Sequence, residues 1–295
     1  MMRYLAYSLV PLLVLVFAAM LAGVAGYFMV LLVGDLSLQK VINKITQVFL
    51  VLGIFPAMAY LKINKTDLGF AERPLFFKQV LQGFGLGLLT LLPVFIILYG
   101  LDITVIDPSQ SWTLGWLAEK TVIALLLALL ISLLEEPLFR GILFVGLSRK
   151  LPVVAAIAIS AMYYAALHFI KTKTEIPAQD ITLSSGFYLM AEAFANLLNP
   201  DIFPALLALL MVGMFLGLLR TQVKTGLGLC IGCHTAWVWQ IKMSKTLFNT
   251  DYSADYAYLV SHYDGVVGPL VTVWLMLAVA GYLIYLRISK RSNCV

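Results

Sequence analysis

Residues 131–143 read ISLLEEPLFRGIL and place Glu135, Glu136 and Arg140 inside an apolar stretch that runs from 122 to 147. A stretch of about 20 apolar residues is long enough to cross the hydrocarbon core of a bilayer. An ionisable side chain at the bilayer centre costs about 2.5–3.5 kcal/mol on insertion scales, so three in one span require a partner or a function. The stretch therefore predicts a membrane-spanning helix that carries a site.

The composition of the whole chain agrees with a membrane protein. Of the 295 residues, 62% are hydrophobic and 12% are charged, and the mean hydropathy is +0.96. Soluble domains are about 45–50% apolar and about 25% charged, so a water-soluble, disordered or disulfide-scaffold protein is excluded. Long unbroken apolar runs also exclude a membrane barrel, whose strands alternate. The predicted fold class is all-α, a polytopic transmembrane helix bundle.

Apolar runs and loop charges predict about eight spans and an orientation. The first run is about 29 residues long, which exceeds the roughly 7–15 residues of a signal-peptide core, so we interpret it as a retained helix. With eight spans, the side that holds both termini has 12 basic and 2 acidic residues, and the other side has 7 and 11. The positive-inside rule places both termini in the cytoplasm. The predicted spans are Leu5–Val33, Val41–Leu61, Phe77–Tyr99, Val122–Leu147, Val153–Phe169, Phe203–Leu219, Leu227–Phe248 and Val266–Ile288.

We divide the chain into N-terminal helices (1–118), a core (119–248) and a C-terminal loop and helix (249–295). The core contains an outer loop, 170–202, in which GFYLMAEAFANLL (186–198) predicts a packed surface helix; an interfacial helix or a lid is the alternative. Glycines four residues apart within spans predict close helix packing; these are Gly83 with Gly87, and Gly213 with Gly217.

The spacing of the three charges separates their roles. Glu136 and Arg140 are four residues apart on one helix face, so they can form an ion pair. Glu135 is rotated by about 100° from Glu136 and stays unpaired. An unpaired carboxylate in an apolar site can accept a proton from water near neutral pH. Pro137 predicts a distortion that frees a backbone carbonyl. A purely structural network of the three charges is the alternative.

Two histidines lie within predicted spans, His168 in MYYAALHF and His234 in LCIGCHTAWVW. Each one alone is explained by a hydrogen bond between helices, but both together with a free glutamate could activate water. Counting about 1.5 Å per residue from the cytoplasmic span ends places Glu135, His168 and His234 about 18, 22 and 10 Å deep. This count alone does not place the three side chains at the same depth in the membrane.

These motifs resemble the CPBP family of intramembrane proteases, which comprises CAAX and bacteriocin-processing proteases and is also called Abi or type II CAAX prenyl endopeptidases. The resemblance rests on EEPLFRG, on Tyr164-x-x-x-His168, and on His234. It implies an intramembrane endopeptidase that hydrolyses a peptide bond in a membrane-associated peptide or protein. Glu135 would be the general base with help from His168, and His234 would stabilise the oxyanion.

In the same resemblance Glu136, Arg140 and Tyr164 would support the site, with Tyr164 where the family commonly has phenylalanine. Val238 stands where the family has asparagine or aspartate. We favour a reaction without a metal cofactor, with zinc held by Glu135, His168 and His234 as the alternative.

Other functions fit parts of the sequence. A catalytically weak relative could act as a bacteriocin-immunity factor or a membrane scaffold, and Val238 supports that alternative. A proton-coupled carrier could use Glu135 and the histidines as a relay. Cys230-Ile-Gly-Cys233-His234 matches a haem-attachment string and could hold zinc, but burial of two small side chains is the simpler interpretation. The expected location is a bacterial inner membrane, with the bilayer and a peptide substrate as partners and no nucleic acid.

Overall fold

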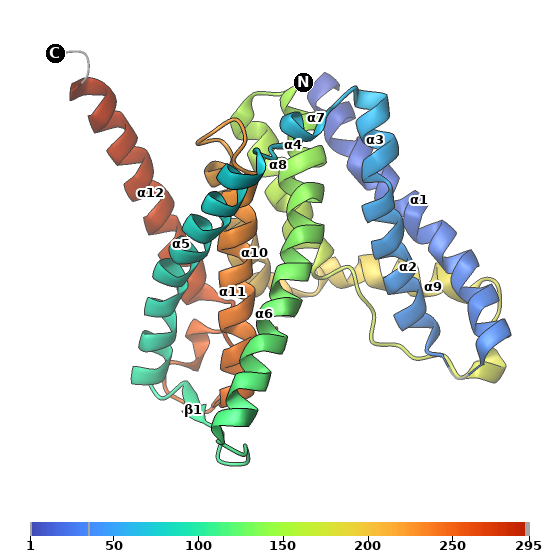
Figure 1. Cartoon of the computed structure of the whole chain (residues 1–295). Helices are drawn as coiled ribbons and strands as arrows, with labels where there is room; N and C mark the ends of the chain where they lie inside the picture. Colours follow the sequence, from blue (N-terminus) through green and yellow to red (C-terminus); the bar gives the residue numbers. More distant parts are fainter. Residues whose placement is uncertain (1, 35, 293–295) are drawn as a thin grey trace.

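The computed structural model describes residues 2–34 and 36–292, which form an almost entirely helical protein with one two-stranded antiparallel sheet (Figure 1). The strands are β1 (Thr104–Ile106) and β2 (Phe248–Thr250), with Thr104 opposite Thr250. The α-helices are α1 (Met2–Val33), α2 (Leu38–Leu52), α3 (Ile54–Leu61), α4 (Lys65–Leu68), α5 (Arg73–Gly100), α6 (Leu114–Glu136), α7 (Phe144–Ser148), α8 (Val153–Leu167), α9 (Ser185–Ala195), α10 (Phe203–Arg220), α11 (Leu227–Leu247) and α12 (Pro269–Ser292). The shorter elements are η1 (Pro137–Leu143), η2 (Ala178–Asp180), η3 (Asn196–Leu198), η4 (Pro200–Ile202) and η5 (Ala257–Leu259).

Each of the eight predicted spans lies on helices of the structure. Within the described residues, five helical stretches are long and apolar enough to cross a membrane, and α8 and α12 contain shorter apolar stretches. The protein is therefore an almost entirely helical integral membrane protein, and the count of eight spans stays a prediction. The five stretches are Tyr7–Val33, Leu38–Leu61, Lys65–Gly100, Leu114–Ser148 and Pro200–Arg220.

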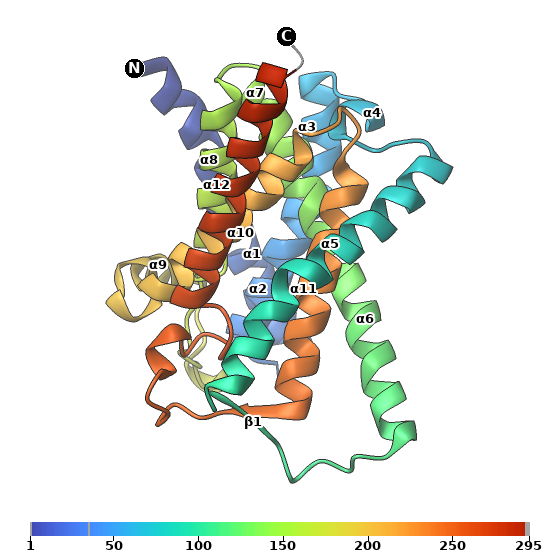
Figure 2. The ribbon, with the colours of Figure 1, turned by 90° about the vertical axis from the view of Figure 1, so that its left-hand side faces the viewer.

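Helix α11 lies at the centre of the bundle, packed between α5 and α6 (Figure 2). Twelve of its 21 residues are buried, so protein rather than lipid surrounds most of its polar side chains. Glycines allow the close approach: a Cβ atom at Gly87 of α5 would lie 2.6 Å from the carbonyl oxygen of Cys233. One at Gly217 of α10 would lie 2.7 Å from Ile157 of α8. The predicted glycine packing is confirmed at both helix pairs.

The helix that carries the charged motif is continuous but widened at its centre. After Glu136, α6 passes into a π-helical turn, η1, and then into α7. Proline has no amide hydrogen to donate, and a π-turn shifts the bonding pattern by one residue, so carbonyls become available to other partners. Ser160 Oγ donates to the Phe139 carbonyl at 2.9 Å, and Arg220 Nε donates to the Arg140 carbonyl at 3.2 Å. The distortion predicted from Pro137 is present.

The position of Arg220 differs from the sequence analysis, which counted it as a charge in a cytoplasmic loop. Its side chain is only 5% exposed, and its guanidinium donates to the carbonyls of Arg140, Lys224 and Asp67. Several carbonyl acceptors replace the water that a buried guanidinium loses. Arg220 therefore connects η1 to α4 and to the loop that follows α10.

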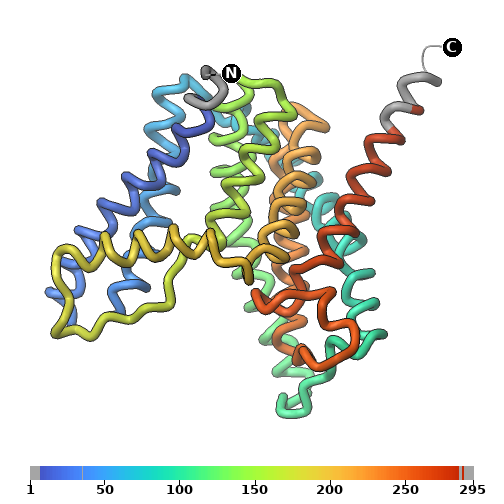
Figure 3. Tube along the Cα trace, turned by 180° about the vertical axis from the view of Figure 1, so that it is seen from behind, coloured from blue at the N-terminus to red at the C-terminus, as the bar shows by residue number. Residues whose placement is uncertain are grey.

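Helices α1, α2, α3 and α9 form a separate wing beside the bundle (Figure 3). Helix α9 packs along α1, where Gly186 approaches Gly23 closely, so the segment 186–198 includes the packed helix that the sequence predicts. Two adjoining cavities of about 850 and 510 Å³ lie between this wing and the α6–α8 region and share five wall residues. These shared residues are Leu15, Leu50, Leu138, Phe139 and Leu167.

Candidate active site

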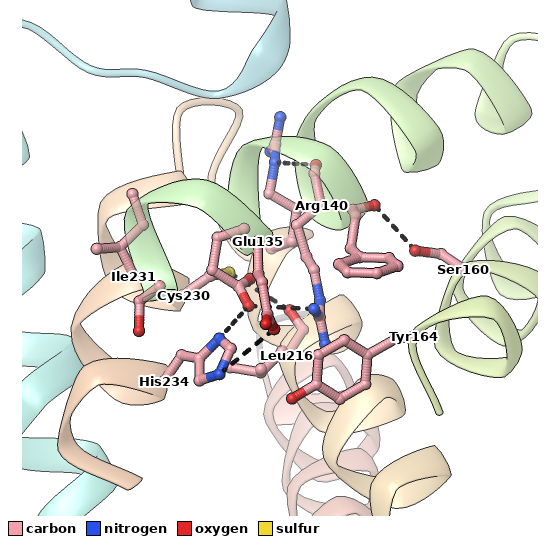
Figure 4. Close-up of polar contacts among 12 residues, drawn as sticks. Glu135, Arg140, Ser160, Tyr164, Leu216, Cys230, Ile231 and His234 are labelled. Carbon is pink, nitrogen blue, oxygen red and sulfur yellow. Dashed lines mark hydrogen bonds and ion pairs between the residues drawn. The ribbon is translucent and has the colours of Figure 1, made fainter. Parts of the chain in front are cut away.

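The site begins with a buried charge network at the junction of α6 and η1. Glu136 and Arg140 are 0% and 1% exposed, and the Arg140 guanidinium lies 3.1 Å from Glu136 Oε1. The same oxygen lies 2.7 Å from His234 Nδ1, on the neighbouring α11 (Figure 4). The structure thus contains the ion pair predicted from the four-residue spacing, and it adds His234 as a third member. Glu136 therefore fixes both the arginine and one imidazole.

Glu135 occupies a different environment from its neighbour. Its side chain is 31% exposed, and Oε2 lies 3.9 Å from His234 Nε2. That separation is too long for a hydrogen bond, and Oε2 accepts no hydrogen bond from any described residue. Glu135 also lines the cavity of about 510 Å³. The carboxylate that the sequence analysis left unpaired is therefore partly exposed at the cavity, while its Oε2 is buried and accepts no hydrogen bond from the described residues.

His168 lies at the C-terminal end of α8 and lines the same cavity as Glu135. Its Nδ1 is 2.7 Å from the carbonyl oxygen of Tyr164. A carbonyl can only accept, so Nδ1 carries a proton, and Nε2 of the neutral ring is left as an acceptor. The structure therefore brings His168 and Glu135 to one cavity and His234 Nε2 to within 3.9 Å of Glu135, although depth counting had separated the three.

Tyr164 packs against Arg140 of the charged network and against both imidazoles. Its ring is 3% exposed and stands edge-on to His168 at 4.7 Å and to His234 at 6.0 Å between ring centres. The Arg140 guanidinium lies 4.4 Å from the Tyr164 ring centre, within the range of a cation–π contact. The ring thus contacts Arg140 and both histidines.

Val238 faces a small apolar cavity of about 60 Å³ beside His234 and Tyr164. Valine offers no hydrogen-bonding group, so the position contributes shape but no polar contact to the site. The sequence analysis missed Ser160 and Arg220, which bind the carbonyls of η1. Neither stands out in the sequence, because a lone serine in an apolar helix and an arginine beside a loop are both common.

The zinc alternative of the sequence analysis concerns Glu135, His168 and His234. Among the described residues, no group of three His, Cys, Asp or Glu side chains is arranged so that it could hold a metal ion. Cys230 and Cys233 are buried free thiols, and Cys230 Sγ donates to the Leu216 carbonyl at 3.4 Å.

Comparison with known families identifies the segment that holds this site. Residues 116–240 match the family described as type II CAAX prenyl endopeptidase Rce1-like. No curated protein and no solved structure matches the chain. The match covers Glu135, Glu136, Arg140, His168 and His234, and it confirms the resemblance inferred from EEPLFRG.

Proposed function

We propose that this chain, whose residues 116–240 match the family described as type II CAAX prenyl endopeptidase Rce1-like, hydrolyses a peptide bond in a membrane-associated peptide or protein with water activated by Glu135. One observation carries the proposal. The Glu135 carboxylate has a buried oxygen with no hydrogen-bond partner among the described residues, 3.9 Å from His234 Nε2, in the cavity that His168 also lines.

The proposed reaction begins with a water molecule held between Glu135 and His168 Nε2. Glu135 takes a proton from this water as its oxygen attacks the carbonyl carbon of the substrate. In this proposal His234 holds protons on both ring nitrogens from the start of the reaction: Nδ1 donates to Glu136, and Nε2 donates to the oxyanion of the tetrahedral intermediate. Glu135 returns its proton to the leaving amine as the C–N bond breaks.

The Glu136–Arg140 pair has a positioning role in this proposal. Glu136 holds His234 through Nδ1, and Arg140 neutralises Glu136 from within the same helix. A catalytic group must stay within about 0.5 Å of its productive position, and buried hydrogen bonds supply that restraint. Tyr164 packs against the network and both imidazoles and limits their movement.

The direct test compares wild type, Glu135→Gln and His234→Ala for turnover of a fluorogenic peptide in detergent or vesicles. General-base catalysis contributes about 10²–10⁴-fold, so Glu135→Gln should lose at least about a hundredfold in kcat while its thermal unfolding stays close to wild type. Glu119→Gln is the matched control, because that glutamate lies on the same helix with 59% of its side chain exposed. Equal turnover in Glu135→Gln and wild type would disprove the proposal.

A chelator added to the wild-type enzyme tests the chemistry separately. We expect turnover to be unchanged, because Glu135 accepts the proton directly. Loss of turnover that returns on adding zinc would establish a metal-dependent reaction and contradict this mechanism.

Val238 favours a second candidate function, that of a catalytically weak relative acting as an immunity factor or membrane scaffold. The site has no amide or carboxylate at that position to assist His234. A scaffold would keep its cellular phenotype when Glu135 is replaced by glutamine, whereas a protease would lose it.

A further inference from the structure

The larger of the two cavities, of about 850 Å³, has apolar walls and a basic rim. Its walls come from α1, α2 and α3 of the wing and from η1, α7 and the end of α8. Arg149 and Lys150, which directly follow α7, line its rim, and no acid lines it in the part of the chain that the structure describes. An occupant that matches this lining is hydrocarbon along most of its length and anionic at one end.

The depth of this cavity corresponds to one leaflet of a bilayer. Tyr7 and Leu15 both line it and are eight positions apart on α1, so this wall is about 12 Å long at about 1.5 Å per residue. The hydrocarbon core is about 30 Å thick, which gives about 15 Å for each leaflet. The Lys150 ammonium lies 5.9 Å from the Tyr7 ring centre, so the basic rim is at the outer end of this wall. Helix α7 lies at the end of the structure where α1 begins (Figure 1).

The two basic side chains of the rim are exposed, and neither forms an ion pair with an acid among the described residues. Arg149 Nη1 donates to the Leu61 carbonyl at the end of α3, and Lys150 lies beside the Tyr7 ring. A guanidinium has five N–H donors and an ammonium has three, so both groups retain donors for a further partner. An anionic group with several acceptor oxygens, such as a phosphate, matches this pair of cations.

Contacts between the wing and the bundle hold the walls of the cavity in place. Tyr163 Oη of α8 donates to the Ser8 carbonyl of α1 at 2.5 Å, and the Arg149 contact joins the end of α7 to α3. Sites for small molecules are usually formed before the ligand binds and measure about 300–1,000 Å³. The cavity falls in that range, and its walls are joined without an occupant.

We propose that this cavity binds one anionic phospholipid, with Arg149 and Lys150 contacting its phosphate and an acyl chain lying against the walls formed by α1 and η1. Burial of hydrocarbon and attraction between basic side chains and an anionic headgroup both favour this binding. The lipid comes from the leaflet at the end of the molecule where α1 begins. The proposal does not depend on peptide hydrolysis, and its test measures binding alone.

The test titrates the delipidated protein in detergent with phosphatidylglycerol and measures the Kd of the first bound lipid by native mass spectrometry. Phosphatidylcholine with the same acyl chains is the comparison, because its choline cation cancels the charge of the phosphate. Each basic residue beside an anionic lipid is worth about fivefold in affinity, so two predict that wild type binds phosphatidylglycerol about thirtyfold more tightly. Equal Kd values for the two lipids would overturn the proposal.

Charge variants locate the headgroup. The Arg149→Gln, Lys150→Gln double variant should lose this preference for phosphatidylglycerol. The Lys65→Gln, Lys224→Gln double variant is the charge-matched control, because both lysines are exposed and neither lines the cavity. The control should keep the preference of wild type. An equal loss in both double variants would show general attraction of lipid to a basic surface, and a preference retained without Arg149 and Lys150 would place the lipid elsewhere; either result contradicts the proposal.

A substitution inside the cavity tests the position of the acyl chain. Gly146 of α7 lines the cavity, and a Cβ atom there would meet only Leu61, at the ordinary contact distance of 3.4 Å. Gly146→Leu therefore fills part of the cavity and leaves the basic rim intact. Displacing about two methylene groups of the lipid should weaken phosphatidylglycerol binding about tenfold. The unfolding midpoint without added lipid should stay at or above that of wild type, because leucine has the higher helix propensity. An unchanged Kd would mean that the cavity holds no acyl chain and would overturn the proposal.

Discussion

Glu135 and Glu136 are neighbours in the chain, but their side chains lie in different surroundings. Glu136 is fully buried and bound by a guanidinium and an imidazole, while Glu135 is 31% exposed at a cavity. The 100° turn between successive helix positions is sufficient to point one carboxylate into the protein and the other at the cavity. Glu136 Oε1 is occupied by Arg140 and His234, whereas Glu135 Oε2 has no hydrogen-bond partner among the described residues, as the proposed reaction requires.

Replacing Glu136 by glutamine should destabilise the protein strongly. The change would leave the Arg140 charge buried without a counter-charge, and breaking a buried pair in this way costs about 3–5 kcal/mol. We expect a clear fall in the unfolding midpoint in detergent, together with loss of turnover as His234 loses its anchor.

Glu175→Gln provides the comparison for that experiment. It removes the ion pair between Glu175 and Lys40, whose side chains are 65% and 76% exposed, respectively. Exposed ion pairs contribute at most about 1 kcal/mol to stability. Similar small shifts for both variants would show that Glu136 is not ionised in the folded protein.

At the scale of whole elements, the crossing of α5 and α11 sets the position of His234. Gly87→Ala would place a Cβ atom 2.6 Å from the Cys233 carbonyl oxygen and 2.7 Å from Ala236. Overpacking of this kind costs about 1–3 kcal/mol, and any relaxation displaces α11 next to His234. We expect lower thermal stability and lower kcat, measured on the same preparation.

The control for the Gly87→Ala experiment lies two residues away in the chain. Gly85 is on α5 as well, but a Cβ atom there meets nothing within 4 Å, and alanine has the higher helix propensity. Gly85→Ala should therefore match or exceed wild-type stability. A loss in Gly85→Ala as large as in Gly87→Ala would refute the close-packing account.

The sequence predicted those elements and contacts that depend on local spacing. Helix positions, the Glu136–Arg140 pair and the glycine contacts follow from the 3.6-residue period and from side-chain size. The meeting of Glu135 with His234 could not be predicted, because depth counting treats helices as straight and parallel. Neither assumption holds here, because the π-turn that begins at Pro137 distorts one helix and α11 crosses its neighbours. The contacts of Arg149 and Tyr163 were missed because they join segments far apart in the chain.

At the scale of the whole molecule, the wing and the bundle together enclose the site. The cavity beside Glu135 has walls from α1, α2, α6, η1 and α9, so neither part forms it alone. The adjoining larger cavity is mostly apolar, and its rim carries Arg149 and Lys150. The cavity beside Glu135 is therefore lined by both the family-matched segment and the N-terminal helices outside it.

The orientation of the molecule is a prediction that one labelling experiment can test. Helix α1 begins and α12 ends at the same end of the structure, and the β1–β2 sheet lies at the opposite end (Figure 1). The charge tally of the sequence analysis assigns 12 basic and 2 acidic residues to the side that holds the termini, so that side should face the cytoplasm. In a Cys294→Ser background, Ser109→Cys and Ser253→Cys should react with a membrane-impermeant maleimide in intact cells. Lys224→Cys should react only after permeabilisation. The reverse pattern would invert the orientation, and labelling of Ser109→Cys without Ser253→Cys would contradict an arrangement in which both loops leave the membrane on one side.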